Sequence, residues 1–262
     1  MRYLSRDLAD SMKNPAFWAF SGWLNIVVRV RRSRLGVFWL IAPSVVYVWG
    51  IALIFGAMLG KTADIYAAHV ALGWVVFKIL HAVTADTTHC LFSARSFILD
   101  GRTRLTDYVL RSLATALFHF MMSLPAVIIA VCIYPHLHMA GVLEGLAAFP
   151  LVLVNVLWIG ILFSIIGARH PDLSDFIGNI FMFLFLLTPI VWYASSMSAH
   201  SLRGILSRMN PFFHLIEIVR APMLGEPLSM SSWVYVGVMT VVGWLAAVIA
   251  YRRYAKFVPV WL

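Results

Sequence analysis

Long apolar runs alternate with short polar segments along most of the chain. A helix needs about 20 apolar residues to span a membrane. Six stretches have that length and character: residues 36–59, 65–85, 112–134, 145–167, 176–194 and 232–250. The pattern predicts an all-α integral membrane protein. Residues 1–262 would form one transmembrane domain, with a six-span bundle over residues 36–250.

A segment of a different kind precedes the first apolar run. Between residues 15 and 28, large apolar side chains recur about every 3.5 positions, and polar side chains lie between them. This spacing predicts an amphipathic helix at the membrane interface, within a cytoplasmic or interfacial N-terminal segment over residues 1–35. The alternative is a helix on a soluble face of the protein, but the chain has almost no soluble domain to cover.

The longest segment expected on the outer side lies between the fifth and sixth spans. Residues 195–231 contain Pro211, Pro222 and Pro227, together with apolar pieces too short to span, such as residues 212–216. Short apolar helices outside a bundle are typical of re-entrant or interfacial elements. Pro189 is expected to bend the fifth span near its outer end.

Basic residues are distributed unevenly between the two sides of this bundle. With the N-terminus inside, 15 of the 20 lysines and arginines lie on the inner side, four lie on the outer side, and Lys78 lies within the second span. The positive-inside rule then places both termini in the cytoplasm. The net charge of +9 therefore reports membrane orientation, because no basic platform with interleaved aromatic residues indicates nucleic acid.

Composition supports the same class and excludes several kinds of chemistry. With 62% hydrophobic and 12% charged residues, the chain has too little polar surface for a soluble globule. Residues 56–62 resemble a P-loop, but only three residues separate their glycines and they lie on the outer side. His136 and His138 lack a third ligand for a metal. We therefore expect no catalytic residue, metal or cofactor in this chain.

The second span carries an unusual polar face. Lys78, His81, Asp86 and His89 fall within an arc of about 140° at 100° per residue. Such residues avoid lipid and face a cavity, a partner or each other. Lining a channel and packing the bundle are both consistent with this face.

Three motifs, in order along the chain, carry a family resemblance. Residues 29–43 read RVRRSRLGVFWLIAP, residues 167–172 read GARHPD and are followed by TPI at 188–190, and NP at 210–211 is followed by RAPMLG at 220–225. The set resembles the inner-membrane permeases of ABC-2-type transporters, particularly those that export lipid-linked polysaccharides such as O-antigen, capsule or teichoic acid.

The resemblance implies a homodimer in the bacterial inner membrane, whose two copies line one channel. It also implies a cytoplasmic ABC-type ATPase as partner, which would bind ATP and Mg. The other partners would be membrane lipid and the lipid-linked polysaccharide that is exported. Residues 195–231 would form the external gate, and we name Asn210, Pro211 and Arg220 as its candidates. Coupling to the ATPase is expected in the loop after the second span, at Arg95, Asp100, Arg102 and Arg104. An ordinary positive-inside anchor is the alternative for that loop.

Two further groups are candidates for handling the substrate. Arg29, Arg31, Arg32 and Arg34 are concentrated beside the cytoplasmic headgroups, where they would bind a pyrophosphate-linked lipid or simply fix the topology. On the fifth span Phe181, Phe185, Thr188 and Trp192 recur at helical spacing. Phe181, Phe185 and Trp192, with Lys78, are the channel-lining candidates, since aromatic faces offer apolar contact to sugar C–H groups. Packing against a neighbouring helix is the alternative.

Two other functions remain open at this stage. One is an ABC-2 exporter of a drug or small lipid, which the same motifs would fit. The other is an intramembrane enzyme acting on a lipid-linked substrate through Lys78, His81, Asp86 and His89, although a nucleophile or metal constellation is missing.

Overall fold

The computed structural model describes residues 3–58, 60, 62–101, 103–196, 198 and 201–262. Within these residues the secondary structure is helical. The helices are α1 (Leu4–Lys13), α2 (Pro15–Arg31), α3 (Phe38–Met58), α4 (Ala63–Ser93), α5 (Arg95–Leu99), α6 (Leu105–Ile133), α7 (Met139–Arg169), α8 (Leu173–Leu187), α9 (Leu202–Met209), α10 (Pro211–Leu224), α11 (Met230–Tyr254) and α12 (Val258–Trp261), with a 3-10 turn over Ala194–Ser196.

Five of the described helices are long and apolar enough to cross a membrane: α3, α4, α6, α7 and α11. They correspond to the first four predicted spans and the last one. The helices α4 and α7 each contain 31 residues. At about 1.5 Å per residue they are longer than a hydrocarbon core of about 30 Å. These two helices therefore extend beyond the apolar runs from which they were predicted.

The fifth predicted span is wrong in its outer part. Helix α8 contains 15 residues and ends at Leu187, not at Ala194. The reason is Pro189, which lacks an N–H group and disfavours helical geometry at the residue before it. Thr188 accordingly has extended backbone angles, φ −80° and ψ 134°. Residues 176–194 therefore form a short helix followed by an irregular link.

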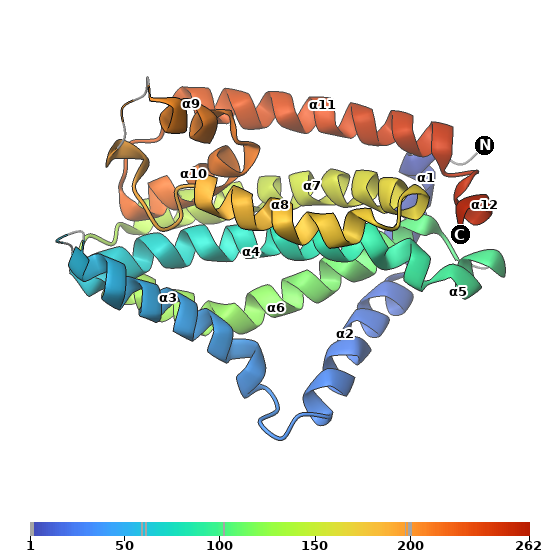
Figure 1. Cartoon of the computed structure of the whole chain (residues 1–262), viewed down its shortest axis with the longest axis horizontal. Coiled ribbons are helices and arrows are strands. Elements are labelled where there is room, and N and C mark those ends of the chain that lie inside the picture. Colours follow the sequence, from blue (N-terminus) through green and yellow to red (C-terminus); the bar gives the residue numbers. More distant parts are fainter. Residues whose placement is uncertain (1–2, 59, 61, 102, 197, 199–200) are drawn as a thin grey trace.

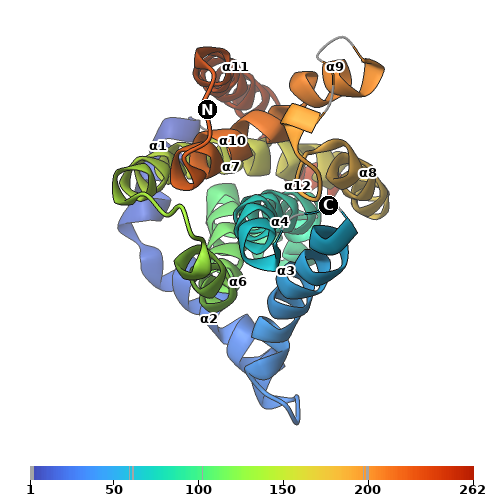
Figure 2. The same cartoon turned by 90° about the vertical axis from the view of Figure 1, so that its left-hand side faces the viewer.

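Helix α4 lies in the middle of the molecule (Figures 1 and 2). It packs against α3, α6, α7, α8 and α10. Small side chains such as Ala67, Ala71 and Gly73 are found on this helix, and the first two are fully buried. Close packing of this kind lets one helix be surrounded by several others. The helices α1, α5 and α12 lie at one end of the molecule, and α9 lies at the other (Figure 1).

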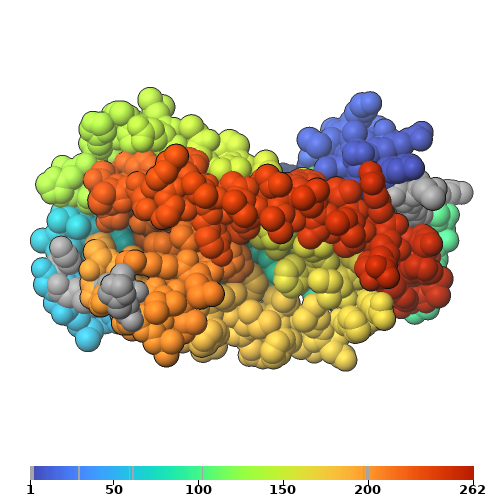
Figure 3. All heavy atoms as spheres, turned by 90° about the horizontal axis from the view of Figure 1, so that it is seen from above, coloured from blue at the N-terminus to red at the C-terminus, as the bar shows by residue number. Residues whose placement is uncertain are grey.

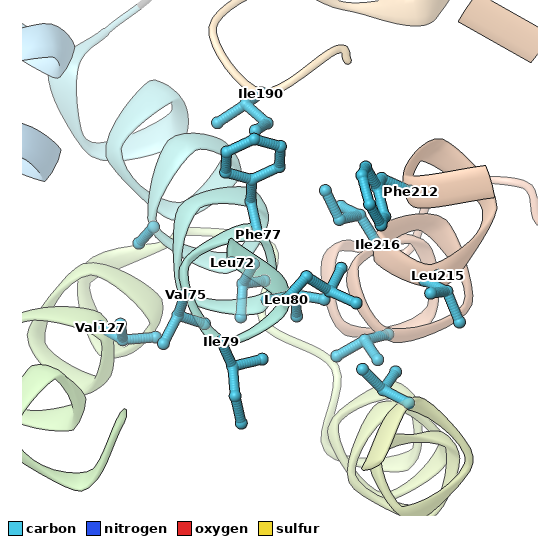
Figure 4. Packing of buried hydrophobic residues seen from close by; sticks show 14 of the residues in the cluster. Leu72, Val75, Phe77, Ile79, Leu80, Val127, Ile190, Phe212, Leu215 and Ile216 are labelled. Carbon is cyan, nitrogen blue, oxygen red and sulfur yellow. The ribbon is translucent and has the colours of Figure 1, made fainter. Parts of the chain in front are cut away.

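Side chains of α4 point outward to different neighbours (Figure 4). Val75 lies toward Val127 of α6, whereas Leu80 lies toward the α10 residues. The ring of Phe77 contacts Phe212 of α10 at a centroid separation of 6.2 Å. The core is thus arranged around α4 and needs α10, a helix from the segment predicted to be external.

The N-terminal segment contains two helices, of which only the second was predicted. Helix α1 is held by Ser11, whose hydroxyl lies 2.7 Å from that of Thr106 in α6, and by a 2.7 Å bond from the Tyr251 hydroxyl to Asp7. Helix α2 covers the predicted residues 15–28, and its location at a membrane interface stays a prediction. Helices α2 and α3 diverge from the bundle and meet as a V at the basic linker (Figure 1).

Gly167 of α7 marks a close approach to α4. A Cβ at this position would overlap the backbone carbonyl of Thr88, which cannot rotate away. We expect Gly167→Ala to lower the melting temperature of the purified protein in detergent. The matched control is Gly178→Ala in α8, where nothing lies within 4 Å of the new methyl group. That change should raise stability by about 0.5–1 kcal/mol through helix propensity alone. Equal melting temperatures for the two variants would contradict the packing.

Candidate functional site

The irregular link after α8 leaves backbone carbonyls without helical partners. Tyr66 of α4 donates its hydroxyl hydrogen to the carbonyl of Val191. Asn210 donates from Nδ2 to Thr188 Oγ1 at 2.7 Å, and its Oδ1 accepts from the N–H of Phe212 at 3.0 Å. Asn210 thus caps the N-terminus of α10 and fixes the start of the link with the same side chain.

Pro211 follows Asn210 at the start of α10. It occupies the first turn of α10, where a missing N–H costs nothing because that group would have no helical partner. The residues of the predicted gate motif therefore have a local structural role, whatever their role in transport.

Arg220 connects the link to α10 and α4. It is 1% exposed. Its Nη1 donates to the carbonyl of Pro189 at 2.6 Å, and its Nη2 donates to Oε2 of Glu217 at 2.7 Å. A buried charge requires such pairing, because desolvation of an unpaired guanidinium would be very unfavourable. Arg220 is therefore the central polar group of this region.

His69 of α4 is the third partner of Arg220. Its Nε2 lies 3.2 Å from Arg220 Nη1. Nε2 also lies 3.4 Å from the carbonyl oxygen of Trp192. A guanidinium can only donate, so at the shorter contact with Arg220 Nε2 accepts, and the neutral ring then carries its hydrogen on Nδ1 and donates nothing to Trp192. That Nδ1 is buried and has no hydrogen-bond partner among the described residues, and the nearest carboxylate oxygen, Oε1 of Glu226, is 4.0 Å away.

Glu226 is placed by the end of α10. Gly225 has a φ of +66°, a left-handed conformation that suits glycine. The N–H of Glu226 then bonds back to the carbonyl of Ala221 at 2.9 Å, and that of Gly225 to Pro222 at 3.1 Å, which is the Schellman arrangement. Burial raises the pKa of Glu226, and the Arg220 guanidinium acts in the opposite direction.

A cavity of about 610 Å³ lies beside these groups, and we call it the α10 pocket. Its walls come from α4, the link, α9, α10 and the start of α11. They include His69, Tyr193, His214, Glu217, Arg220, Glu226 and Tyr235. The helices α9 and α10 that line it lie at one end of the molecule (Figure 1), and its walls combine charged, hydroxyl and aromatic side chains.

A second polar cluster surrounds Lys78, at the middle of α4. Its Nζ donates to the hydroxyl of Ser44 in α3 at 3.0 Å and to that of Ser123 in α6 at 2.8 Å. Among the described residues no carboxylate forms an ion pair with it. Lys78 also borders a cavity of about 360 Å³, together with Ser33, Gly36 and other residues. This cavity therefore connects the half-buried amine to the basic linker.

The other residues of the polar face predicted on α4 are not part of the Lys78 cluster. His81 is half-buried against the ring of Phe181, 4.7 Å between centroids, while Asp86 and His89 are exposed. The four side chains therefore share a helix but no common centre.

The predicted entry arginines lie around the tip of the V formed by α2 and α3. Arg31, Arg32 and Arg34 are exposed, and the side chain of Arg29 lies outside the described part of the structure. Gly36, with φ +53°, lets the chain reverse there.

The predicted coupling loop forms α5 and the start of α6. Arg95 and Asp100 are exposed, and Arg102 lies outside the described residues. Arg104 is the N-cap of α6, and its backbone N–H donates to Oδ2 of Asp107 at 3.0 Å. Its guanidinium pairs with Asp10 of α1 at 3.4 Å. The loop is thus connected to the N-terminal helix.

The three predicted channel aromatics do not share one helical face, because α8 ends before Thr188. Phe181 is 4% exposed and packs on Phe212, 5.4 Å between ring centroids. Phe185 is half-buried and contacts Phe77 at 5.6 Å. Trp192 lies on the link, where the guanidinium of Arg203 is 4.7 Å above its ring.

Phe185 and Trp192 nevertheless border one groove. It has a volume of about 720 Å³, and α3 supplies its other wall through Tyr47, Ile51 and Phe55. Phe181 lies deeper, within the core. Whether the aromatic residues line a channel stays a prediction.

Several residues of these clusters were not found from the sequence. His69 lies nine positions before Lys78, on the opposite side of the helix at 100° per residue, so it does not belong to the polar face of Lys78. A histidine in the first turns of an apolar span was the available signal. Nothing in the sequence distinguished Ser44 and Ser123 from other hydroxyl residues.

The buried pair of Arg220 and Glu217 should be important for stability. We expect Arg220→Met to destabilise the protein by about 3–5 kcal/mol, because it leaves the largely buried carboxylate of Glu217, 14% exposed, and the Pro189 carbonyl without a donor. Thermal unfolding and hydrogen exchange over residues 188–193 would measure this. The control is Arg208→Met, which removes an exposed arginine from the same part of the fold. Equal effects of the two changes would show that Arg220 has no special structural role.

Comparison with known proteins gives related sequences over most of the chain. No family model matches. The chain is 23% identical over 212 residues to nodulation protein J of Rhizobium leguminosarum bv. viciae, covering 77% of this chain and 79% of that protein. It is 24% identical over 199 residues to nodulation protein J of Rhizobium meliloti (strain 1021), covering 72% of this chain and 74% of that protein. It is 25% identical over 227 residues to nodulation protein J of Neorhizobium galegae, covering 79% of this chain and 84% of that protein.

Proposed function

We propose that this chain is the permease subunit of an ABC-2-type transporter that exports a lipid-linked polysaccharide across the bacterial inner membrane. The observation that carries the proposal is the meeting of separate motifs. The TPI, NP and RAPMLG motifs lie apart in the sequence, yet Asn210 bonds to Thr188 and Arg220 bonds to Pro189. The five long apolar helices and the similarity to nodulation protein J over about three quarters of the chain support the same family.

In this proposal α8 is the sixth crossing element, although it is short. It begins at the end of the molecule where α7 finishes, and the link, α9 and α10 complete the passage to the other side. Both termini would then be cytoplasmic, in agreement with the distribution of basic residues. Residues 195–231 would form the external gate, and α2 would lie in the cytoplasmic interface.

The channel would be formed by two copies of the chain. Each copy has a groove bordered by Phe185 and Trp192, and the exposed side of α3 beside it is apolar, with Val46 and Leu53. Two such grooves facing each other would provide aromatic walls along which a sugar chain can slide. Lys78 would act near the inner part of this path, beside the basic linker.

Energy for export would come from a separate ATPase. The chain contains no nucleotide-binding motif, so ATP and Mg would be bound by that cytoplasmic partner. The exposed residues Arg95 and Asp100 and the α1-linked Arg104 are the proposed contacts through which its movement reaches the spans.

One other transport function has support in the structure. The groove beside Phe185 is almost entirely apolar, which would also suit an exporter of a drug or a small lipid. A neighbouring gene for an ATPase with a carbohydrate-binding domain would favour the polysaccharide.

Dependence on the ATPase tests the proposed function directly. The purified chain should neither bind nor hydrolyse ATP, and co-expression should give a complex of two permeases and two ATPases. Arg95→Glu should reduce polymer export at least 10-fold while the complex still hydrolyses ATP, because the loop no longer transmits its movement. The control is Arg6→Glu, which reverses an exposed charge on α1. Hydrolysis by the isolated chain would refute the proposal, and unchanged export by Arg95→Glu would refute the coupling role.

The basic linker should bind the phosphate groups of the substrate at entry. We expect the double change Arg31→Gln and Arg34→Gln to reduce export at least 10-fold while membrane insertion and assembly with the ATPase persist, because charge-assisted bonds to phosphate are lost. Export in proteoliposomes measures the first effect and co-purification the second. Lys13→Gln is the control on the same side of the membrane. If assembly fails together with export, the arginines are topology anchors only.

A further inference from the structure

We propose that the α10 pocket is a binding site for a short, uncharged oligosaccharide on the outer side of each permease subunit. The proposal rests on the proposed function, which supplies sugar to this side of the membrane. The pocket itself has chemistry that the structural role of Arg220 does not explain.

Two tyrosines form part of its walls, and each is supported by a histidine. Tyr193 lies 4.0 Å from the ring of His69, and Tyr235 lies 4.1 Å from that of His214, measured between ring centroids. Both tyrosines are half-buried and border the cavity. Aromatic faces offer broad apolar contact to the C–H faces of sugar rings. Histidines packed against these rings restrict their movement.

Polar groups of both kinds surround the same space. Arg208, Ser195 and Ser229 supply donors on its walls, and Glu217 and Glu226 supply acceptor oxygens. A sugar hydroxyl both donates and accepts, so a polyol can bond to these donors and to the carboxylates together.

The charges of the lining favour a neutral ligand. Arg208 and Arg220 are balanced by Glu217 and Glu226. An anionic headgroup would approach two carboxylates, and a cation would approach two arginines. The volume of about 610 Å³ lies within the range of about 300–1,000 Å³ that is usual for small-molecule sites.

The position of the pocket gives this site a consequence for transport. One wall is the link that follows Pro189, and Arg220 bonds to that link while bordering the cavity. Helix α11 runs along this face of the molecule (Figure 3), and its Tyr235 donates the hydroxyl hydrogen to the carbonyl of Met209 in α9 at 2.9 Å. A bound sugar would therefore contact the same elements that the proposed gate has to move.

The test uses the complete permease–ATPase complex in lipid nanodiscs and saturation-transfer NMR. The probes are mannotriose, maltotriose and N,N′,N″-triacetylchitotriose. At least one should receive magnetisation from the protein at its ring protons. Glu226→Gln, which keeps the shape of the side chain, and Tyr235→Leu should each weaken that binding at least 10-fold. Glu144→Gln, an exposed carboxylate outside the α10 pocket, should leave it unchanged.

Each outcome decides the proposal separately from the transport function. No transfer to any probe, or equal binding by wild type, Glu226→Gln and Tyr235→Leu, overturns the site. A complex that hydrolyses ATP and exports polymer but fails this test refutes the sugar site alone. A chain that binds the probe at this site but never assembles with an ATPase refutes the proposed function and leaves the site standing.

Discussion

A proline in the middle of an apolar run determines the structure of one whole end of this molecule. Pro189 stops α8, and the carbonyls of the following residues must find partners elsewhere. Arg220 is the decisive partner, because its guanidinium bonds to the link and to Glu217 and meets His69 on the central helix. A buried arginine is acceptable only when such partners compensate its charge. The α8–α9 link, α10 and α4 are therefore positioned as one unit.

The central helix makes this arrangement possible. In its most apolar window 78% of the residues of α4 are buried, compared with 22% for α3 and 17% for α11. A helix surrounded by protein can carry His69 and Lys78, since other side chains replace the water that lipid would exclude. The two polar residues serve different neighbours. His69 meets α10 near the N-terminal end of α4, and Lys78 joins α3 to α6 through Ser44 and Ser123.

The sequence predicted those features that depend on local properties. Apolar runs located the spans, and the proline marked the place where α8 is interrupted, but the composition of residues 176–194 suggested that the helix continues. Stopping depends on the backbone at Thr188, not on hydropathy. The docking of α1 through Asp7 and Tyr251 joins residues from opposite ends of the chain, so no local pattern could indicate it. The contacts of Asn210 with Thr188 and of Arg220 with Pro189 join residues of separate motifs, so no local pattern could indicate them either.

The exposed apolar faces differ in a way that bears on assembly. The exposed side of α11 is aliphatic, with Val238, Val242 and Leu245, and lipid alone can cover such a surface. The groove between α3 and α8 is different, because the buried Tyr47 hydroxyl and Trp74 Nε1 have no partners among the described residues, and Tyr47 borders the groove. Lipid tails cannot bond to these groups. Its walls are also aromatic, with Tyr47, Phe185 and Trp192. This contrast favours the α3–α8 side as the face that a second copy would cover in the proposed dimer, because aromatic walls suit the proposed sugar path.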